Sequence, residues 1–107
     1  MNEFIIVFVT CKDHKEANKI TKSLLNKKLC ACVNIVPKIE SHYWWQGKIE
    51  KSSEVLLIIK TRSSLFKKLS SQIKLNHSYE VPEIISFSIS EGNPDYLQWI
   101  TDSTAHQ

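Results

Sequence analysis

The stretch of sequence that decides the fold covers residues 31–50 and reads ACVNIVPKIESHYWWQGKIE. Its apolar and aromatic side chains recur mainly at odd positions, which is the period of a strand with one buried face: Val33, Ile35, Ile39, Tyr43 and Trp45. A strand of this length far exceeds the usual size of about five or six residues. We therefore expect it to bend or to project beyond its own domain.

Three features of this stretch have specific structural meanings. Pro37 has no backbone N–H to donate to a neighbouring strand, so it predicts a bulge or an exposed edge there. Gln46 and Gly47 end the strand and predict a short turn that sends the chain back. The side chains of Trp44 and Trp45 point to opposite faces of the strand, and one chain alone cannot easily bury both.

Three more segments have the composition of strands. Residues 4–9, 48–61 and 84–89 each contain β-branched, aliphatic or aromatic residues, and the first two include unbroken apolar runs. An unbroken apolar run of this length is typical of a strand that is buried on both faces. Together with the long central strand, they predict a sheet of four strands.

Helices are predicted between and after these strands. Three segments have a capping residue followed by apolar side chains at helical spacing, and they begin at Asp13, Ser63 and Asn93. In the first, Glu16 is placed as the partner of Asp13 in a capping box, and the helical pattern ends near Leu29. The second ends near residues 76–77, and the third is short, with Pro94 in its first turn.

The order strand, helix, strand, strand, helix, strand, short helix is that of a ferredoxin-like split βαβ fold. We expect one α+β domain over residues 1–107, with a four-stranded antiparallel sheet and two helices on one face. Residues 4–9 and 55–59 are apolar at both parities, so the other face would expose a large apolar patch. Few residues are left to cover it, and we expect further copies of the chain to do so in a trimeric assembly through the sheet faces.

Composition and charge exclude several classes of protein. The formal charge is +3, and the lysines follow one helical stretch as on a solvated face, so we expect no nucleic-acid partner. We expect no membrane partner and no signal peptide, since no apolar run approaches the roughly 20 residues of a membrane span. The odd number of cysteines favours a cytoplasmic protein. Cys11, Cys30 and Cys32 could form a thiolate metal site, although small thiols on strands are more often buried hydrophobes.

Several motifs resemble, in order along the chain, those of the CutA divalent-cation tolerance proteins. They are ACVNI at 31–35, SHYWWQGKIE at 41–50, Glu54 with LIIKT at 57–61, HSYEVPEI at 77–84 and GNPDYLQWI at 92–100. The similarity covers nearly the whole chain and is therefore far more specific than a single motif. It implies a ferredoxin-like fold, a tightly packed homotrimer, an architecture like that of PII-type signalling proteins, and association with tolerance of copper and other divalent metals.

The resemblance also implies a position for a metal ion. Copper-binding members of the family have a Cys at the end of the first strand and two adjacent His residues before a Tyr. Here the strand ends at Val9 and Thr10 with the thiol at Cys11, and the His pair is replaced by Asn76 and His77. His77 is therefore the candidate ligand for Cu(II) or another divalent ion.

The residues around His77 leave two interpretations open. Glu80 and Glu83 follow it in an irregular segment and could supply oxygen ligands to a borderline divalent ion, with Cys11 as a further candidate. Alternatively, His77 caps the C-terminal end of the second helix, where a partial positive charge is favourable.

Charged and aromatic residues in or beside the apolar strands form a second candidate site, because such residues need partners when they are buried. They are Tyr43, Trp45, Glu50, Glu54, Lys60, Tyr79 and Glu83. One interpretation is a satisfied polar network at a subunit junction. The other is an intersubunit cleft that binds a small anionic or metal-chelating ligand through Lys60 and the aromatic rings.

No catalytic pattern accompanies these candidates. The sequence has no evident nucleophile with a paired base, and its two glycines nearly exclude a phosphate-binding loop. We therefore expect a CutA-like protein of divalent metal tolerance, a homotrimer that binds metal weakly and does not catalyse a reaction. The alternatives are a PII-like module that binds a small ligand in the cleft, and a structural trimer that acts as a scaffold.

Overall fold

The computed structural model describes residues 3–105. Four strands and three α-helices follow one another along the chain, in the order β1 (Phe4–Cys11), α1 (His14–Asn26), β2 (Cys32–Trp45), β3 (Lys48–Arg62), a 3-10 turn (Ser63–Leu65), α2 (Phe66–Asn76), β4 (Ile84–Ser88) and α3 (Pro94–Ser103). The strands form one antiparallel sheet in the order β2-β3-β1-β4. This arrangement confirms the predicted ferredoxin-like split βαβ fold.

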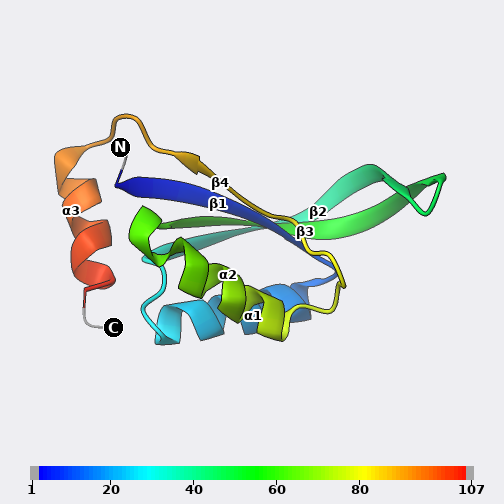
Figure 1. Cartoon of the computed structure of the whole chain (residues 1–107), viewed down its shortest axis with the longest axis horizontal. Coiled ribbons are helices and arrows are strands. Elements are labelled where there is room, and N and C mark those ends of the chain that lie inside the picture. The colour runs from blue at the N-terminus through cyan, green and yellow to red at the C-terminus, as the bar shows by residue number, and fades with distance from the viewer. Residues whose placement is uncertain (1–2, 106–107) are drawn as a thin grey trace.

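One face of the sheet carries the core. Helices α1 and α2 lie side by side across this face, and α3 lies at the end of the sheet away from the β2–β3 hairpin (Figure 1). Alternate side chains of β1 and β3 point into the helices, so that the core joins strand and helix residues: Val7, Val9, Leu57 and Ile59 with Ile20, Leu24, Leu69 and Ile73, all fully buried. Each such side chain contributes about 1.5–3 kcal/mol of burial free energy.

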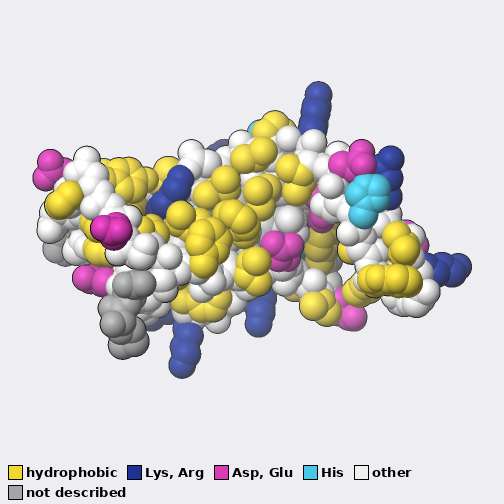
Figure 2. Space-filling view, turned by 90° about the horizontal axis from the view of Figure 1, so that it is seen from above, with side chains coloured by type: hydrophobic (Ala, Val, Ile, Leu, Met, Phe, Trp, Pro, Cys, Tyr) yellow, Lys and Arg dark blue, Asp and Glu magenta, His cyan; other side chains and the backbone are white. Residues whose placement is uncertain are grey.

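The opposite face of the sheet has no cover within the described chain. The register places Phe8 of β1 beside Ile58 and Ile85, and Ile6 beside Phe87. Phe8 and Phe87 pack edge to face with ring centroids 5.0 Å apart, yet 45% of Phe87 and 52% of Ile85 stay exposed. Figure 2 views this face and shows its hydrophobic side chains gathered over the sheet. The apolar open face expected from the two-faced strands is therefore present.

The β2–β3 hairpin extends well beyond the rest of the molecule (Figure 1). Pairing of β2 with β3 shifts register between Val36 and Ile39, which confirms the predicted bulge at Pro37. The hairpin closes at Gln46 and Gly47, both with positive φ, as a two-residue hairpin turn requires. Trp44 and Trp45 keep 72% and 47% of their surface exposed, as expected for neighbours on an uncovered strand.

The first helix ends three residues earlier than predicted, at Asn26. Lys28 adopts a positive φ of 55°, its N–H donates to the carbonyl of Leu25, and the N–H of Leu29 donates to the carbonyl of Leu24. These two bonds form a Schellman motif, which ends a helix and satisfies its last carbonyls. The predicted helix boundary near Leu29 was wrong, because Leu29 is the buried last residue of this motif and lies beyond the helix.

Three other boundaries differ slightly from the predictions. Strand β1 continues to Cys11, and β4 ends at Ser88. The second helix is preceded by a 3-10 turn that begins at the predicted Ser63. Asn93 caps α3 as predicted, since its side-chain oxygen accepts a hydrogen bond of 3.0 Å from the N–H of Asp95.

Candidate functional site

Three potential metal ligands converge where β1 ends. Cys11 is the last residue of β1, Glu16 lies in the first turn of α1, and His77 follows the last residue of α2. The thiol, one carboxylate oxygen and one imidazole nitrogen all lie within 4.8 Å of one another. Topology causes this proximity, because both helices lie on the same face of the sheet and β1 runs between β3 and β4.

Glu16 is held by backbone N–H groups. Its own N–H donates to the Asp13 carboxylate at 2.8 Å, which confirms the predicted cap. Its carboxylate accepts hydrogen bonds from the N–H of Lys12 at 3.1 Å and from the N–H of Ser78 at 2.8 Å. Burial raises the pKa of Glu16, but the hydrogen bonds from Ser78 and Lys12 and the nearby His77 outweigh burial and lower it. Glu16 is therefore a fixed anion between α1 and the segment after α2.

The side chain of His77 is fully buried, and both of its ring nitrogens make hydrogen bonds. Nδ1 accepts a hydrogen bond from the N–H of Tyr79 at 3.1 Å, so Nε2 carries the proton and donates to the carbonyl of Thr10 at 2.7 Å. Nδ1 also lies 3.9 Å from a carboxylate oxygen of Glu16. The ring thus connects the end of α2 to β1 and does not cap the carbonyls of its own helix.

Cys11 supplies the thiol of this group. Its side chain is fully buried, and burial, followed by the negative charges of Glu16, Glu54 and Asp13, raises the pKa of the thiol to about 12. The thiol is therefore protonated at neutral pH, and a metal ion that binds it must displace this proton.

The other predicted ligands lie elsewhere. Cys30 is buried and Cys32 is half-buried, and within the described residues neither belongs to the group formed with Cys11. Glu80 and Glu83 are also outside that group, and they line a separate pocket. Glu16 was not among the ligands predicted from the sequence. Its position three residues after Asp13 was interpreted as that of a capping-box partner.

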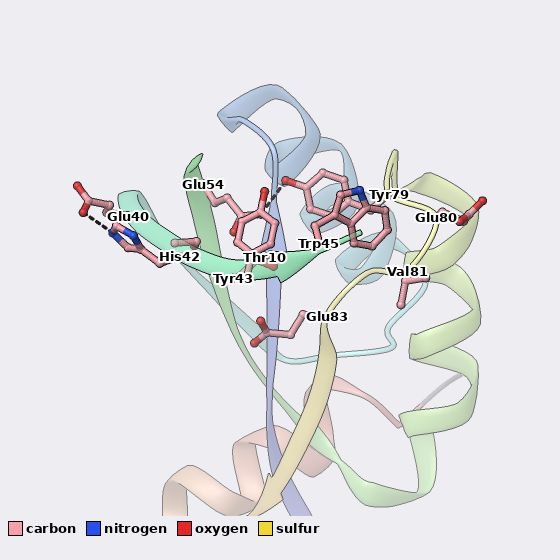
Figure 3. Close-up of a pocket in the computed structure, with 11 residues that line it drawn as sticks. Thr10, Glu40, His42, Tyr43, Trp45, Glu54, Tyr79, Glu80, Val81 and Glu83 are labelled. Atoms are coloured by element: carbon pink, nitrogen blue, oxygen red, sulfur yellow. Dashed lines mark hydrogen bonds and ion pairs between the residues drawn. The ribbon is translucent and has the colours of Figure 1, made fainter. Parts of the chain in front are cut away.

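The separate pocket lies between the β2–β3 hairpin and the segment that leads into β4 (Figure 3). Its volume is about 760 Å³, which is in the range of small-molecule sites. Eleven residues from the end of β1, from the hairpin strands and from the segment before β4 line it: Thr10, Glu40, Ser41, His42, Tyr43, Trp45, Glu54, Tyr79, Glu80, Val81 and Glu83.

The structure brings together most of the predicted cleft residues. Tyr43, Trp45, Glu54, Tyr79 and Glu83 all line this pocket. They come from β2, β3 and the segment before β4, which the sheet topology brings together at one end of the molecule (Figure 3).

The remaining two predicted cleft residues do not line the pocket. Glu50 is exposed on the hairpin, where it pairs with Tyr43 across the ladder. Lys60 lies six residues from Glu54 along β3, about 20 Å in an extended strand, and its ammonium group donates to the side chain of Asn34. Within this single chain the residues that line the pocket include no Lys or Arg, and the intersubunit cleft with Lys60 stays a prediction.

Four of the eleven lining residues are acidic: Glu40, Glu54, Glu80 and Glu83. The Tyr79 hydroxyl donates to Glu54 at 2.6 Å, and burial together with this bond raises the pKa of Tyr79. At the other side of the pocket, His42 Nε2 lies 2.6 Å from a carboxylate oxygen of Glu40. The sequence could have indicated this pair, since residues two apart on a strand face the same side.

Comparison with known proteins places these observations in a family. The family model of the CutA1 divalent ion tolerance protein matches residues 5–103. A curated relative, "Protein CutA 1, chloroplastic" from Oryza sativa, is 49% identical over 94% of this chain and 56% of the relative. The "Divalent-cation tolerance protein CutA" of Thermus thermophilus is 42% identical over 92% of this chain and 96% of the relative.

Solved structures agree with these matches. The crystal structure of CutA1 from Oryza sativa superposes with a TM-score of 0.94 at 46% identity, covering 99% of this chain and 97% of the other. The periplasmic divalent cation tolerance protein CutA from Archaeoglobus fulgidus gives a TM-score of 0.92 at 42% identity over 94% and 98% of the two chains.

Two further observations bear on the whole protein. This chain spans little more than half the length of the plant and mammalian relatives it matches. In the part of the chain that the structure describes, the helices are too short and too polar to cross a membrane. On its family match and identities, this chain belongs to the CutA1 divalent ion tolerance protein family.

Proposed function

We propose that this protein acts in tolerance of divalent metal ions, copper among them, as a homotrimer that binds the ion weakly and does not catalyse a reaction. The observation that carries the metal proposal is the convergence of Cys11, Glu16 and His77 within 4.8 Å. A thiol, an imidazole and a carboxylate form a ligand set suited to borderline ions such as Cu(II) and Zn(II). The family match supplies the class of ion.

The contacts of these groups explain why binding would be weak. The thiol of Cys11, with a pKa raised to about 12, must lose its proton before it can act as a ligand. Nδ1 of His77 must also release the N–H of Tyr79, which it now accepts at 3.1 Å. Metal binding therefore competes with a proton and with a hydrogen bond, and affinity should rise with pH.

Calorimetric titration with Cu(II) tests the site. We expect saturable binding by the unmodified chain and its loss in His77→Ala. His42→Ala is the matched control, because His42 is exposed and pairs only with Glu40 among the groups described, so it would report adventitious surface binding. Absence of saturable binding, or equal binding by His77→Ala, would remove the metal site.

The trimer is supported by the uncovered sheet face. Phe87 and Ile85 are about half-exposed on an apolar surface, and continuous apolar surfaces of this kind are usually interfaces. In such an assembly the projecting β2–β3 hairpin, with exposed Trp44 and Trp45, would reach a neighbouring subunit.

A second candidate function is a PII-like regulatory module that binds a small ligand. The observation that favours it is the pocket of about 760 Å³ lined by Trp45, Glu54, Tyr79 and Glu83, four of the predicted cleft residues. A panel of small charged molecules, screened by thermal shift against the unmodified chain and Trp45→Ala, would test it. Shifts that persist in Trp45→Ala would count against this pocket.

We also propose that the protein works in a reducing compartment, the cytoplasm. All three cysteines are free, and burial raises the pKa of both Cys11 and Cys30 to about 12. Fluorescent-fusion imaging together with thiol labelling of extracts would check this location.

A further inference from the structure

We propose that the layer formed by α1 and α2 binds a chain of linked phosphate groups, inorganic polyphosphate, and that a groove at one end of this layer anchors it. The inference goes beyond the proposed function and does not rest on the metal site. Three observations support it: positive charge is concentrated on this layer, lysines form a row along α1, and three further lysines line the groove.

The charges of the chain are unevenly distributed. Residues 12–28 and 63–76, which contain α1 and α2, carry nine lysines, all exposed, and two acidic residues, a net charge of +7. The rest of the chain carries five basic and nine acidic residues, a net charge of −4. Of the two acidic residues in the helix layer, Glu16 is buried and Asp13 caps α1. The layer therefore presents mainly positive charge to solvent, and such a surface attracts polyanions.

This surface stays accessible in the proposed trimer. Helices α1 and α2 cover one face of the sheet, whereas the apolar face that we expect to meet other copies is the opposite one (Figure 1). The end of α1 and the start of α2 also lie away from the projecting β2–β3 hairpin (Figure 1). The two surfaces through which copies are expected to meet thus leave the helix layer free.

Lysines form a row along α1. Lys15, Lys19 and Lys22 recur at intervals of four and three residues, so they lie on one side of the helix, about 5 Å apart along its axis. From the sequence, the lysines of the first helix predicted only a solvated face, but the fold places Lys67 and Lys68 of α2 in the same layer. A row of cations suits a ligand with repeated negative charges, because each contact releases a counter-ion from the polyanion.

The groove at the end of this layer supplies the anchor. It has a volume of about 450 Å³ and is lined by Lys27, Leu29, Lys67, Lys68, Ser71 and Gln72. The side-chain amide of Gln72 donates to the hydroxyl of Ser23 at 2.8 Å, which connects the two helices beside the groove. Within the described chain, no acidic side chain pairs with the three groove lysines. Their ammonium groups and the Ser71 hydroxyl can therefore donate to phosphate oxygens.

The residues of the layer favour polyphosphate over other polyanions. Single-stranded nucleic acids bind through aromatic rings on which their bases stack, but in the described chain the exposed aromatic side chains lie on the hairpin, β4 and α3. A flat bilayer would touch the projecting lysines and leave the groove empty. A thin, flexible chain of phosphates can enter the groove and continue along the row on α1.

Calorimetric titration of the full chain with inorganic polyphosphate, at salt concentrations between about 50 and 200 mM, tests the inference. We expect saturable binding that weakens as the salt concentration rises. A double variant with Lys67→Gln and Lys68→Gln should bind about tenfold or more weakly. It should also reduce the slope of log affinity against log salt by about two, one for each lost phosphate contact. Both side chains are exposed, so the fold should persist.

The matched control is a double variant with Lys48→Gln and Lys51→Gln. It removes the same charge from exposed positions of the hairpin, and affinity should fall by about twofold at most, since distant exposed charges are screened. Cys11→Ser should bind polyphosphate as the unmodified chain does, which separates this inference from the metal proposal. No saturable binding at the lowest salt, equal losses in the two double variants, or equal affinity for single-stranded DNA or phosphatidylserine vesicles would each overturn it.

Discussion

The carboxylate of Glu16 accepts hydrogen bonds from two separate backbone segments, and these bonds lower its pKa. The carboxylate accepts the N–H groups of Lys12 and Ser78 at 3.1 and 2.8 Å, and so it connects the start of α1 to the segment after α2. Its lowered pKa means that the folded chain binds its proton less tightly than the unfolded chain, for which the pKa is about 4.3. Stability from this carboxylate is present above that pKa and is lost as the pH falls below it.

We expect Glu16→Gln to lower the free energy of unfolding at pH 7 by about 1.5–3 kcal/mol, the range for hydrogen bonds to a charged group. The difference from the unmodified chain should shrink as the pH approaches 3. Urea unfolding with a metal chelator present, repeated across this range, measures both quantities. Glu91→Gln, an exposed position, is the control, and a pH-independent effect of Glu16→Gln would contradict the assignment.

Two tyrosines in the same pocket should differ in their contribution to stability. Tyr79 donates to the buried Glu54 at 2.6 Å, whereas the Tyr43 hydroxyl contacts the side chain of Ser52 at 3.2 Å in an exposed position. We expect Tyr79→Phe to cost about 1–3 kcal/mol, since it leaves a buried carboxylate without a donor. Tyr43→Phe should cost about 0.5 kcal/mol or less. Thermal unfolding of both variants would test this, and equal costs would contradict it.

At the level of single residues, the sequence predicted which side chains are candidates but did not predict their contacts. His77 and Cys11 could be named as ligands, but the contacts of His77 could not be derived. Its hydrogen bonds to the carbonyl of Thr10 and from the N–H of Tyr79 depend on how β1 and α2 meet. Lys60 was predicted to belong to an intersubunit cleft because charged residues in apolar strands need partners. Within one chain its partner is Asn34 on the neighbouring strand β2, a pairing that the sequence alone does not reveal.

Among the elements, the β2–β3 hairpin depends most on its turn. Gly47 has φ of 79°, and a Cβ added there would meet nothing within 4 Å, so a substitution would act through backbone strain alone. We expect Gly47→Ala to weaken the hairpin by about 1 kcal/mol. Hydrogen exchange of the amides at residues 43–50 measures this loss. Gly47→Asn should cost less, because Asn tolerates positive φ, and an equal cost for both variants would argue against this explanation.

Most elements were predictable because their signals are local. Alternation along β2, the missing donor of Pro37 and the caps at Asp13 and Asn93 depend on neighbours in sequence, and the structure bears them out. The end of α1 was not predictable in this way. A positive φ at Lys28 has no sequence signal, since glycine usually occupies that position in a Schellman motif.

At the scale of the whole molecule, the uncovered sheet face determines assembly. Placing a charge at its centre should oppose association, because the charge would be buried against a second apolar surface. We therefore expect the unmodified chain to sediment with about three times its mass of 12.4 kDa, and Phe87→Glu to shift toward the monomer. Leu75→Glu is the control, since Leu75 is exposed at the end of α2, away from that face.

Sedimentation equilibrium decides this point. If the unmodified chain stays monomeric at micromolar concentration, the interpretation of the sheet face as an interface is contradicted. Equal dissociation of the Phe87→Glu and Leu75→Glu variants would indicate general destabilisation and would contradict it too.

The most direct test of the central claim, metal binding by the cluster at the end of β1, is titration with Co(II) followed by absorption spectroscopy. Co(II) does not oxidise thiols as Cu(II) can, and a bound thiolate gives a charge-transfer band in the near ultraviolet. We expect this band to saturate at one Co(II) per chain, to persist in Cys32→Ser and to disappear in Cys11→Ser. No band in the unmodified chain, or a band unchanged in Cys11→Ser, would contradict the claim.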